Sequence, residues 1–284
     1  MENINKYSAD GLREILSRHG KILKKSLGQN FLFDRKILDS IVSASVGDKK
    51  ENILEIGAGV GLLTEMLCQN ARKVVTVEID NTLPDILRET VPQDNFVLHL
   101  EDVLKADFPS LSKRHFGAEK FTVVGNLPYY ITGKILDKLM QNISLCHRAV
   151  IMVQREVAKR LQSKPGSKEY RAVTAQVQAL FEVEYIVTVP PHCFVPAPHV
   201  DSAVIRLTPR QNAVVKPQDV TEYLHFVCMA FSSRRKQLKS LAGTLGTTPD
   251  KVVQSLATLG FDETMRAESL TPDQLAELFY LLKG

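Results

Sequence analysis

The segment Asn126 to Tyr130, N-L-P-Y-Y, places hydrogen-bond acceptors beside aromatic rings at the end of a β-branched run. Pro128 has no N–H and stiffens the loop, so neighbouring carbonyls can face a ligand without forming ladder hydrogen bonds. An exocyclic amine on a base is a poor nucleophile because its lone pair is delocalised into the ring. The Asn126 side-chain carbonyl and a main-chain carbonyl near Leu127 could hold both amine hydrogens and aim that lone pair. Fixed carbonyl dipoles would then stabilise the positive charge that develops on the nitrogen.

Two aromatic residues could hold the faces of such a base. Tyr129 is placed to stack on a base that has left its own stack. Phe194 lies in F-V-P-A-P-H-V-D-S, a stretch that its prolines make rigid. Stacking on an aromatic ring is worth roughly 1–3 kcal/mol per base, so we predict that Phe194 covers the second face. A lone Phe is usually a core residue, and the prediction depends on its occurrence together with N-L-P-Y.

A glycine run, G-A-G-V-G, follows the apolar run 52–56 and precedes a helical pattern. Gly57 and Gly59 let the backbone turn sharply and approach a ligand closely. The dinucleotide fingerprint is G-x-G-x-x-G, whereas the spacing here is G-x-G-x-G. Glu55 precedes the turn, and no basic residue stands nearby to meet a phosphate. A ligand with a sulfonium and an amino-acid tail, S-adenosylmethionine, suits this acidic loop better than a dinucleotide.

Two further carboxylates follow the next two strand candidates. Glu78 lies about twenty residues past the glycine turn, where an acidic side chain can accept hydrogen bonds from both ribose hydroxyls. Asp102 follows the third strand and is placed to accept a hydrogen bond from the adenine amine of the cofactor. Either acid alone could be a solvated loop residue or a helix cap. Three successive strand ends with Gly57, Glu78 and Asp102 predict one cofactor crevice.

The elements that must position these residues follow an α/β pattern. Short β-branched runs alternate with amphipathic stretches, which predicts parallel strands joined by right-handed crossovers. We expect a doubly wound, Rossmann-like sheet of seven strands over residues 52–56, 73–77, 96–100, 122–124, 149–153, 185–189 and 203–207.

The pattern changes near Pro209, beyond which only helical periodicity remains. In the last helix Thr271 is the expected N-cap, with Pro272 in the first turn and Gln274 completing a capping box. We therefore predict a cofactor-binding catalytic domain with an N-terminal helical extension over residues 1–209. A small all-helical domain that contacts RNA is expected over residues 210–284.

Composition sets outer limits on function. Lys and Arg exceed Asp and Glu by 36 to 32, a surplus that permits nucleic-acid binding without requiring it. The four cysteines are far apart and form no C-x-x-C pair, which predicts a reducing compartment and no metal. The first 20 residues resemble neither a signal peptide nor a transit peptide, and no run reaches the roughly 18 apolar residues of a membrane span. We expect a cytoplasmic monomer with no membrane partner.

Taken together, the motifs resemble those of the ribosomal RNA adenine dimethyltransferases, and most closely the branch that modifies small-subunit (16S) rRNA. The segments that carry the resemblance span almost the whole chain: K-K-S-L-G-Q-N-F-L, L-E-I-G-A-G-V-G-L-L-T, V-E-I-D, G-N-L-P-Y-Y, F-V-P-A-P-H-V-D-S, F-S-S-R-R-K and R-A-E-S-L-T-P-D-Q-L. The resemblance implies a methyltransferase sheet and dimethylation, from S-adenosylmethionine, of two adjacent adenosines near the 3′ end of that rRNA, with a part in ribosome biogenesis.

The resemblance also implies site residues. It adds Asn30 and Leu32 to the cofactor contacts Gly57, Gly59, Glu78, Asp102 and Asn126. It places Asn126, Leu127, Pro128, Tyr129 and Phe194 around the target base. Two basic groups could meet phosphates, which give affinity but no sequence choice. The first is Lys21, Lys24 and Lys25, and the second, on a helix beginning near Thr221, is Arg234, Arg235, Lys236 and Lys239. Charges on a helix are often only a solvated face.

Two other functions remain open at this point. A large-subunit rRNA adenine dimethyltransferase of the macrolide-resistance type would share the fold and the N-L-P-Y motif. A ribosome-assembly or transcription factor could keep the fold without catalysis. The C-terminal R-A-E-S-L-T-P-D-Q-L and the Arg-Arg-Lys run favour the small-subunit branch, and the intact Asn126 and Glu78 favour an enzyme.

Overall fold

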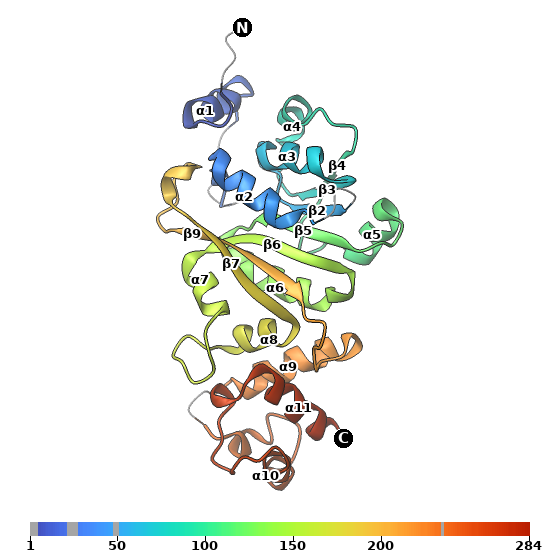
Figure 1. Ribbon diagram of the computed structural model, residues 1–284, viewed down its shortest axis with the longest axis vertical. Coiled ribbons are helices and arrows are strands. Elements are labelled where there is room, and N and C mark those ends of the chain that lie inside the picture. The colour runs from blue at the N-terminus through green and yellow to red at the C-terminus, as the bar shows by residue number, and fades with distance from the viewer. Residues whose placement is uncertain (1–4, 22–27, 48–50, 234–235) are drawn as a thin grey trace. The chain divides into compact units, whose positions relative to one another are not determined.

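The computed structural model describes residues 5–21, 28–47, 51–233 and 236–284. Its centre is a seven-stranded sheet in the order β4-β3-β2-β5-β6-β9-β7 (Figure 1). The strands are β2 (Asn52–Ile56), β3 (Lys73–Glu78), β4 (Phe96–Leu100), β5 (Phe121–Asn126), β6 (Cys146–Gln154), β7 (Phe181–Val189) and β9 (Ser202–Pro209). Each predicted strand is present, and the doubly wound α/β fold is confirmed.

The strand order explains where a ligand can bind. Strands β2 and β3 pair in parallel, and β2 and β5 also pair in parallel on the other edge of β2. The chain therefore leaves β2 toward one side of the sheet and returns on the other side at β5. Ligands of open α/β sheets bind outside the carboxyl ends of the strands at such a switch point. Residues that follow β2, β3 and β5 are consequently brought together.

One detail of the sheet differs from the predicted parallel pattern. Strand β9 pairs antiparallel with β6, with Ile151 opposite Ile205. The connection from β7 to β9 contains only the short 3-10 helix Pro191–Cys193 and the strand β8 (Phe194–Val195). A parallel crossover usually carries an α-helix, and this connection has no α-helix. A β-branched run shows that a strand exists but does not show its direction.

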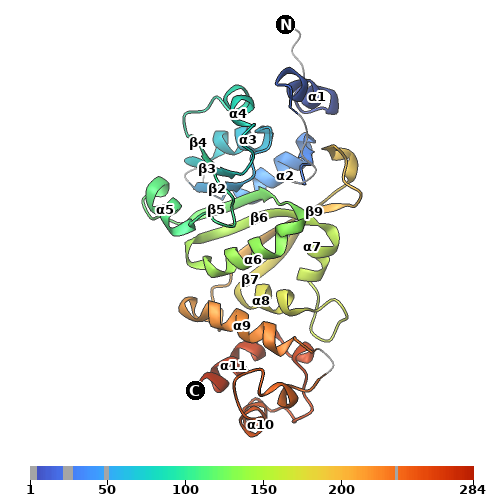
Figure 2. The same ribbon diagram turned by 180° about the vertical axis from the view of Figure 1, so that it is seen from behind.

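Helices cover both faces of the sheet. On one face, α2 (Arg35–Ser45), α3 (Leu62–Asn70) and α4 (Pro84–Thr90) pack over β2, β3, β5 and β6, with α1 (Ala9–Arg18) outside them. On the opposite face lies α6 (Thr132–Gln141), which Figure 2 shows in front of β6. The remaining helices of this part are α5 (Phe108–Phe116) and the start of α7 (Arg155–Leu161). The buried sheet is the rigid support for the loops at its carboxyl edge.

A second, two-stranded sheet joins the N-terminal segment to the F-V-P-A-P segment. Strand β1 (Phe31–Leu32) pairs antiparallel with β8, with Leu32 opposite Phe194. Both strands are buried. The sequence did not predict this sheet, because each strand has only two residues and its partner lies more than 160 positions away.

The chain divides into two compact units. The first consists of residues 1–158 and 184–208, and the second of residues 159–183 and 209–284. The second unit contains α8 (Ala172–Leu180), α9 (Val220–Ala230), α10 (Pro249–Thr258) and α11 (Pro272–Lys283). The expected boundary near Pro209 coincides with one point where the chain passes between the units. The second unit also includes residues 159–183, which no sequence pattern assigned to it. In α11 the predicted capping box of Thr271 and Gln274 is confirmed.

Candidate active site

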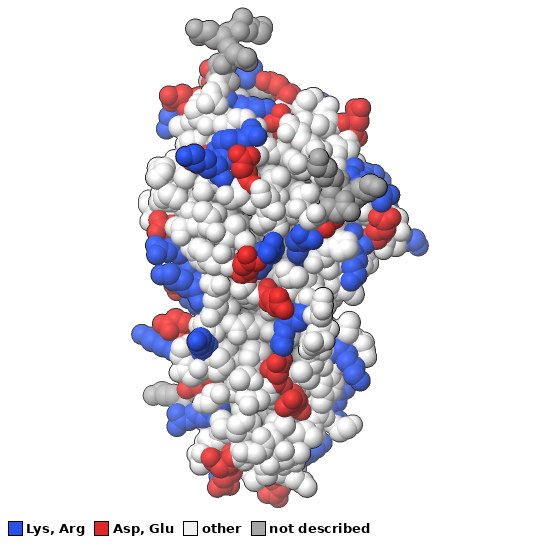
Figure 3. All heavy atoms as spheres, in the orientation of Figure 1, with Lys and Arg blue, Asp and Glu red and all other residues white. Residues whose placement is uncertain are grey.

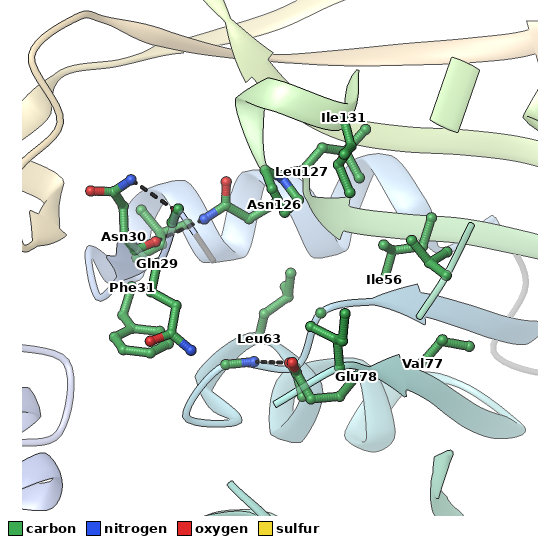
Figure 4. A pocket seen from close by; sticks show the side chains of 18 of the residues that line it. Gln29, Asn30, Phe31, Ile56, Leu63, Val77, Glu78, Asn126, Leu127 and Ile131 are labelled. Carbon is green, nitrogen blue, oxygen red and sulfur yellow. Dashed lines mark hydrogen bonds between the residues drawn. The ribbon is translucent and has the colours of Figure 1, made fainter. Parts of the chain in front are cut away.

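A cavity of about 260 Å³ opens at the carboxyl ends of β2, β3 and β5. The N-terminal segment 28–32 forms another part of its wall, and Figure 4 shows Gln29 and Asn30 on the same side as Asn126. Eight predicted site residues on the sheet and its loops line the cavity: Gly57, Gly59, Glu78, Asp102, Asn126, Leu127, Pro128 and Tyr129. Asn30 and Leu32 line it as well. The fold therefore brings together residues from five separate segments of the chain.

The glycine turn follows β2 and is held close to β3. Gly57 has a φ of +79°, and its N–H donates to the Val77 carbonyl at 2.9 Å. A Cβ at Gly57 would meet no atom within 4 Å, so it would stand in open space at the cavity wall. Gly59 has a φ of +55°, and a Cβ there would lie 2.9 Å from the Phe31 ring. Glycine at these two positions keeps the backbone conformation and leaves room beside it.

Glu78, at the end of β3, is a buried acid held by main-chain donors. Its Oε1 accepts from the Asp80 N–H at 2.8 Å, and its Oε2 accepts from the Gly59 N–H at 3.3 Å. Desolvation by burial raises the pKa of Glu78, and the two main-chain hydrogen bonds oppose that rise. Each carboxylate oxygen has a second lone pair, so the side chain can still accept from ligand hydroxyls.

Asp102 follows β4 and borders the same cavity. Its Oδ1 accepts from the Leu104 N–H at 2.9 Å, which fixes the side chain against its own loop. The second oxygen, Oδ2, remains suited to a ligand amine. Glu78 and Asp102 thus occupy the ends of adjacent parallel strands.

Asn126, the last residue of β5, is oriented by the N-terminal segment. Its Nδ2 donates to the main-chain carbonyl of Asn30 at 2.9 Å. Because the side-chain amide is planar, this hydrogen bond also fixes Oδ1, which Figure 4 shows turned away from Asn30. The site therefore presents the Asn126 carbonyl oxygen in one orientation before a ligand arrives.

Around Pro128 the main-chain carbonyls have different roles. The Pro128 carbonyl accepts from the Ile131 N–H at 3.1 Å and from the Thr132 hydroxyl at 3.3 Å. Both lone pairs of that oxygen are thus engaged. The Leu127 N–H donates to the Met152 carbonyl, which ties the loop to β6. The Leu127 carbonyl is therefore the better second acceptor beside Asn126.

The two tyrosines of N-L-P-Y-Y differ in their surroundings. The Tyr129 hydroxyl lies 2.6 Å from the Ser202 hydroxyl, and burial raises the pKa of Tyr129. This contact links the N-L-P-Y loop to the V-D-S end of the second aromatic segment. Tyr130 also lines the cavity and is 62% exposed at its rim. Sequence reasoning singled out Tyr129 and missed Tyr130, although both belong to the motif.

Phe194 does not line the cavity. The residue is 3% exposed and belongs to the apolar core that includes β1 and β8. Pairing of Leu32 with Phe194 draws this residue inward, so the described conformation does not present the ring to a base. The role of Phe194 against the target base stays a prediction, and here the ring supports the segment that carries Asn30.

The predicted RNA contacts are only partly described. Lys24, Lys25, Arg234 and Arg235 lie outside the described residues. The expectation that Lys21 meets a phosphate is wrong, because its side chain is 3% exposed and forms an ion pair with Asp80. Lys236 is exposed. The prediction that it lies on the helix from Thr221 is wrong, because α9 ends at Ala230. The chain turns directly after the helix, where the Ser232 N–H donates to the Met229 carbonyl. On the face drawn in Figure 3, Lys and Arg side chains are mixed with Asp and Glu.

In the ranges that the structure describes, no group of three or more His, Cys, Asp or Glu side chains is arranged to hold a metal. Within the same ranges, no helix is long and apolar enough to cross a membrane.

Behind the glycine turn, Glu55 is a fully buried carboxyl. Its Oε2 accepts from the Thr64 hydroxyl at 2.8 Å and the Thr76 hydroxyl at 2.5 Å. Among the described atoms, Oε1 has no hydrogen-bond partner. Desolvation is the main cause that raises the pKa of Glu55 to about 7, and the two threonine hydrogen bonds oppose it.

The buried carboxyl should make stability fall as pH rises. Between the unfolded-state pKa and about 7, the folded state keeps a proton on Glu55 that the unfolded state releases, so stability is present below this window and is lost across it. Urea unfolding measures the free energy of unfolding at each pH. From pH 5 to pH 8 this free energy should fall by roughly 3 kcal/mol more in the wild type than in Glu55→Gln, at about 1.4 kcal/mol per pKa unit. The exposed Glu119→Gln is the control and should follow the wild type. Parallel curves for Glu55→Gln and wild type would contradict the assignment.

Comparison with known proteins gives one consistent result. The family model described as ribosomal RNA adenine dimethylase matches residues 20–283. A relative from Lachnoclostridium phytofermentans, named ribosomal RNA small subunit methyltransferase A, is 40% identical over 273 residues, 93% of each chain. A relative of the same name from Shouchella clausii is 42% identical over 283 residues, 97% of this chain and 96% of the relative.

Solved structures show the same fold. A dimethyladenosine transferase from Plasmodium falciparum superposes with a TM-score of 0.74 at 25% identity, covering 87% of this chain and 95% of the other. The 23S rRNA methyltransferase ErmE superposes with a TM-score of 0.67 at 28% identity, covering 90% of this chain and all of the other. The fold is the Rossmann-like α/β fold of rRNA methyltransferases.

Proposed function

Because the chain belongs to the ribosomal RNA adenine dimethylase family, we propose that it dimethylates the exocyclic amines of two adjacent adenosines near the 3′ end of small-subunit (16S) rRNA, with S-adenosylmethionine as methyl donor. It is an enzyme of the methyltransferase type. The observation that carries the proposal is the Asn126 side chain, held by the Asn30 carbonyl in a cavity that Glu78 and Asp102 also line.

The proposed chemistry needs an amine nitrogen with its lone pair aimed at the methyl group. In this site Asn126 Oδ1 and the Leu127 carbonyl accept the two amine hydrogens. As the nitrogen becomes cationic, these fixed dipoles stabilise it without having to reorient. No strong base is required, because the positively charged nitrogen releases its proton readily afterwards. Tyr129 stacks on the base, which leaves its helix or loop to enter the site.

The residues that line the cavity fit S-adenosylmethionine. Its sulfonium supplies an electrophilic methyl group. Glu78 accepts from the ribose hydroxyls, and Asp102 accepts from the adenine amine. The space beside Gly57, which a Cβ would fill, admits the ligand close to the backbone. Asn30 and Leu32 cover it from the N-terminal segment.

Identity to the curated relatives favours the small subunit as substrate. Relatives named for the small subunit are 40% and 42% identical over nearly the full chain, whereas the 23S rRNA methyltransferase ErmE is 28% identical. We propose that the protein works in the cytoplasm as a monomer. The basic residues Lys24, Lys25, Arg234, Arg235 and Lys236 are proposed to contact rRNA phosphates.

Methyl transfer from a labelled donor tests the proposal directly. The purified protein is offered immature small subunits, naked small-subunit rRNA and naked large-subunit rRNA, with label counted and nucleosides identified by mass spectrometry. We expect dimethyladenosine in the small-subunit material. Label confined to large-subunit RNA would support the macrolide-resistance type of activity instead. Tight binding to small subunits without transfer would support a non-catalytic assembly factor.

A further inference from the structure

Asp80 is a buried acid two residues beyond Glu78 that the proposed chemistry does not use. Its side chain has no exposed surface. Oδ1 accepts from the Thr82 N–H at 3.2 Å and from the Thr82 hydroxyl at 2.7 Å, which closes the turn after β3. Oδ2 accepts from Gln29 Nε2 at 2.6 Å and from Lys21 Nζ. One carboxylate thus joins the turn after β3 to Lys21 and to Gln29 of the segment 28–32.

Helix α1 delivers Lys21 to this carboxylate. The Lys21 N–H donates to the Leu16 carbonyl at 2.8 Å, and Gly20 takes a φ of +56°, so the helix ends in a tight C-terminal turn. The Lys21 side chain is 3% exposed and forms an ion pair with Asp80. A buried charge needs such a partner, because leaving it unpaired is strongly destabilising.

Helix α1 is itself docked on the same unit. Its apolar side chains Leu12, Ile15 and Leu16 are buried in the core cluster. Before the helix in the chain, Lys6 forms an ion pair with Glu65 on α3 at 2.5 Å. At the last residue of the helix, Arg18 forms an ion pair with Glu89 on α4 at 2.9 Å. The position of Lys21 is therefore fixed by packing on both sides.

Asp80 is one member of a chain of hydrogen bonds around the cavity. The Gly59 N–H and the Asp80 N–H hold the two oxygens of Glu78. The Asp80 side chain holds Gln29, and the next residue, Asn30, accepts from Asn126. Figure 4 shows Gln29, Asn30 and Asn126 along one wall, with Glu78 across from them. The chain of contacts runs from the glycine turn to the amide proposed to orient the target amine.

We infer that Asp80 is a positioning residue, which holds the segment 28–32 against the cavity through Gln29 and holds the end of α1 through Lys21. It thereby links cofactor binding to the orientation of Asn126. This inference rests on the proposed function in one respect, that S-adenosylmethionine or its product occupies the cavity. Asp80 itself is not among the residues that line the cavity, so it acts through Glu78 and Gln29.

Removal of the negative charge should loosen the segment and weaken cofactor binding. Asp80→Asn keeps the shape of the side chain but leaves Lys21 without its counter-ion. We expect the Kd for S-adenosylhomocysteine, measured by calorimetry, to rise roughly 10- to 100-fold, the range for losing hydrogen bonds to a charged group. Hydrogen exchange of the amides in residues 28–32 should accelerate, while the amides of β2 and β5 stay protected.

A matched control and a second variant keep the test decisive. Asp85→Asn removes an exposed carboxylate that pairs with Arg88 on the same side of the fold, and should leave both readouts unchanged. Lys21→Met keeps the aliphatic length of the buried side chain and leaves Asp80 in place. It should raise the same Kd at least about fivefold, and it decides the matter if Asp80→Asn does not fold.

The outcomes separate this inference from the proposed function. A folded Asp80→Asn or Lys21→Met protein with wild-type affinity and wild-type exchange in residues 28–32 would overturn the positioning role, even if its melting temperature falls. If the wild type binds S-adenosylhomocysteine but methylates no small-subunit RNA, the proposed substrate fails. The effect of Asp80 on cofactor affinity would still stand.

Discussion

Asn126→Ala should lower the rate of methyl transfer at least about 100- to 1000-fold while leaving RNA binding close to that of the wild type. This range is typical for removing one fixed group that stabilises developing charge. Asn126 handles the amine and contacts no phosphate in the proposed arrangement, so the affinity for small-subunit RNA has no reason to change. Single-turnover transfer of labelled methyl and a filter-binding assay on the same preparations measure the two quantities.

A second asparagine provides the matched control. Asn142 also donates its side-chain N–H to a main-chain carbonyl, that of Lys138 at 2.9 Å, but it follows α6 and does not line the cavity. Asn142→Ala should transfer methyl at the wild-type rate. An Asn126→Ala protein that keeps more than about a tenth of the wild-type rate would contradict the acceptor role of Oδ1, given the loss typical of such a group.

Glu78→Gln should weaken binding of S-adenosylhomocysteine by roughly 10- to 100-fold, the cost of losing hydrogen bonds to a charged acceptor. In the wild type, both Glu78 side-chain oxygens accept from main-chain N–H groups, those of Asp80 and Gly59. The amide of Gln would place its own N–H₂ group against one of these donors. Calorimetry gives the Kd, and rates at saturating donor should fall less than the affinity, because Glu78 stands away from the amine.

Glu119→Gln is the control for Glu78. Glu119 pairs with Arg72 and accepts from Asn52 at the amino end of β2, far along the strand from the cavity. It should bind S-adenosylhomocysteine as the wild type does. If Glu78→Gln keeps the wild-type Kd and loses only the rate, Glu78 belongs to the transfer step and not to cofactor binding.

Local sequence patterns were enough to find the strands and much of the cavity. Each β-branched run became a strand, and the residues directly after β2, β3 and β4 line one cavity. The reason is geometric, since parallel strands end at a common edge whatever their loops contain. Asn30 came only from the family resemblance, because a polar residue in a loop has no periodicity to mark it.

Other features needed partners that are distant in the chain. The Asn126 amide depends on a carbonyl 96 positions earlier. Asp80 follows Glu78 by two residues and looks like an ordinary turn acid until Lys21 and Gln29 are placed beside it. The end of α9 at Ala230 could not be foreseen from composition, and Lys236 therefore lies outside the predicted helix.

The sequence by itself determined the type of chemistry and the edge of the sheet where it takes place. It did so through the glycine spacing, Glu78, Asp102 and the N-L-P-Y motif, because these features act through backbone conformation and residue type over a few positions. The tertiary structure alone decided how the site is held. It set the direction of β9, the burial of Phe194 against Leu32, and the contacts of Asp80. These depend on which distant segments pack together to bury apolar surface and satisfy polar groups, a choice that no short stretch of sequence contains.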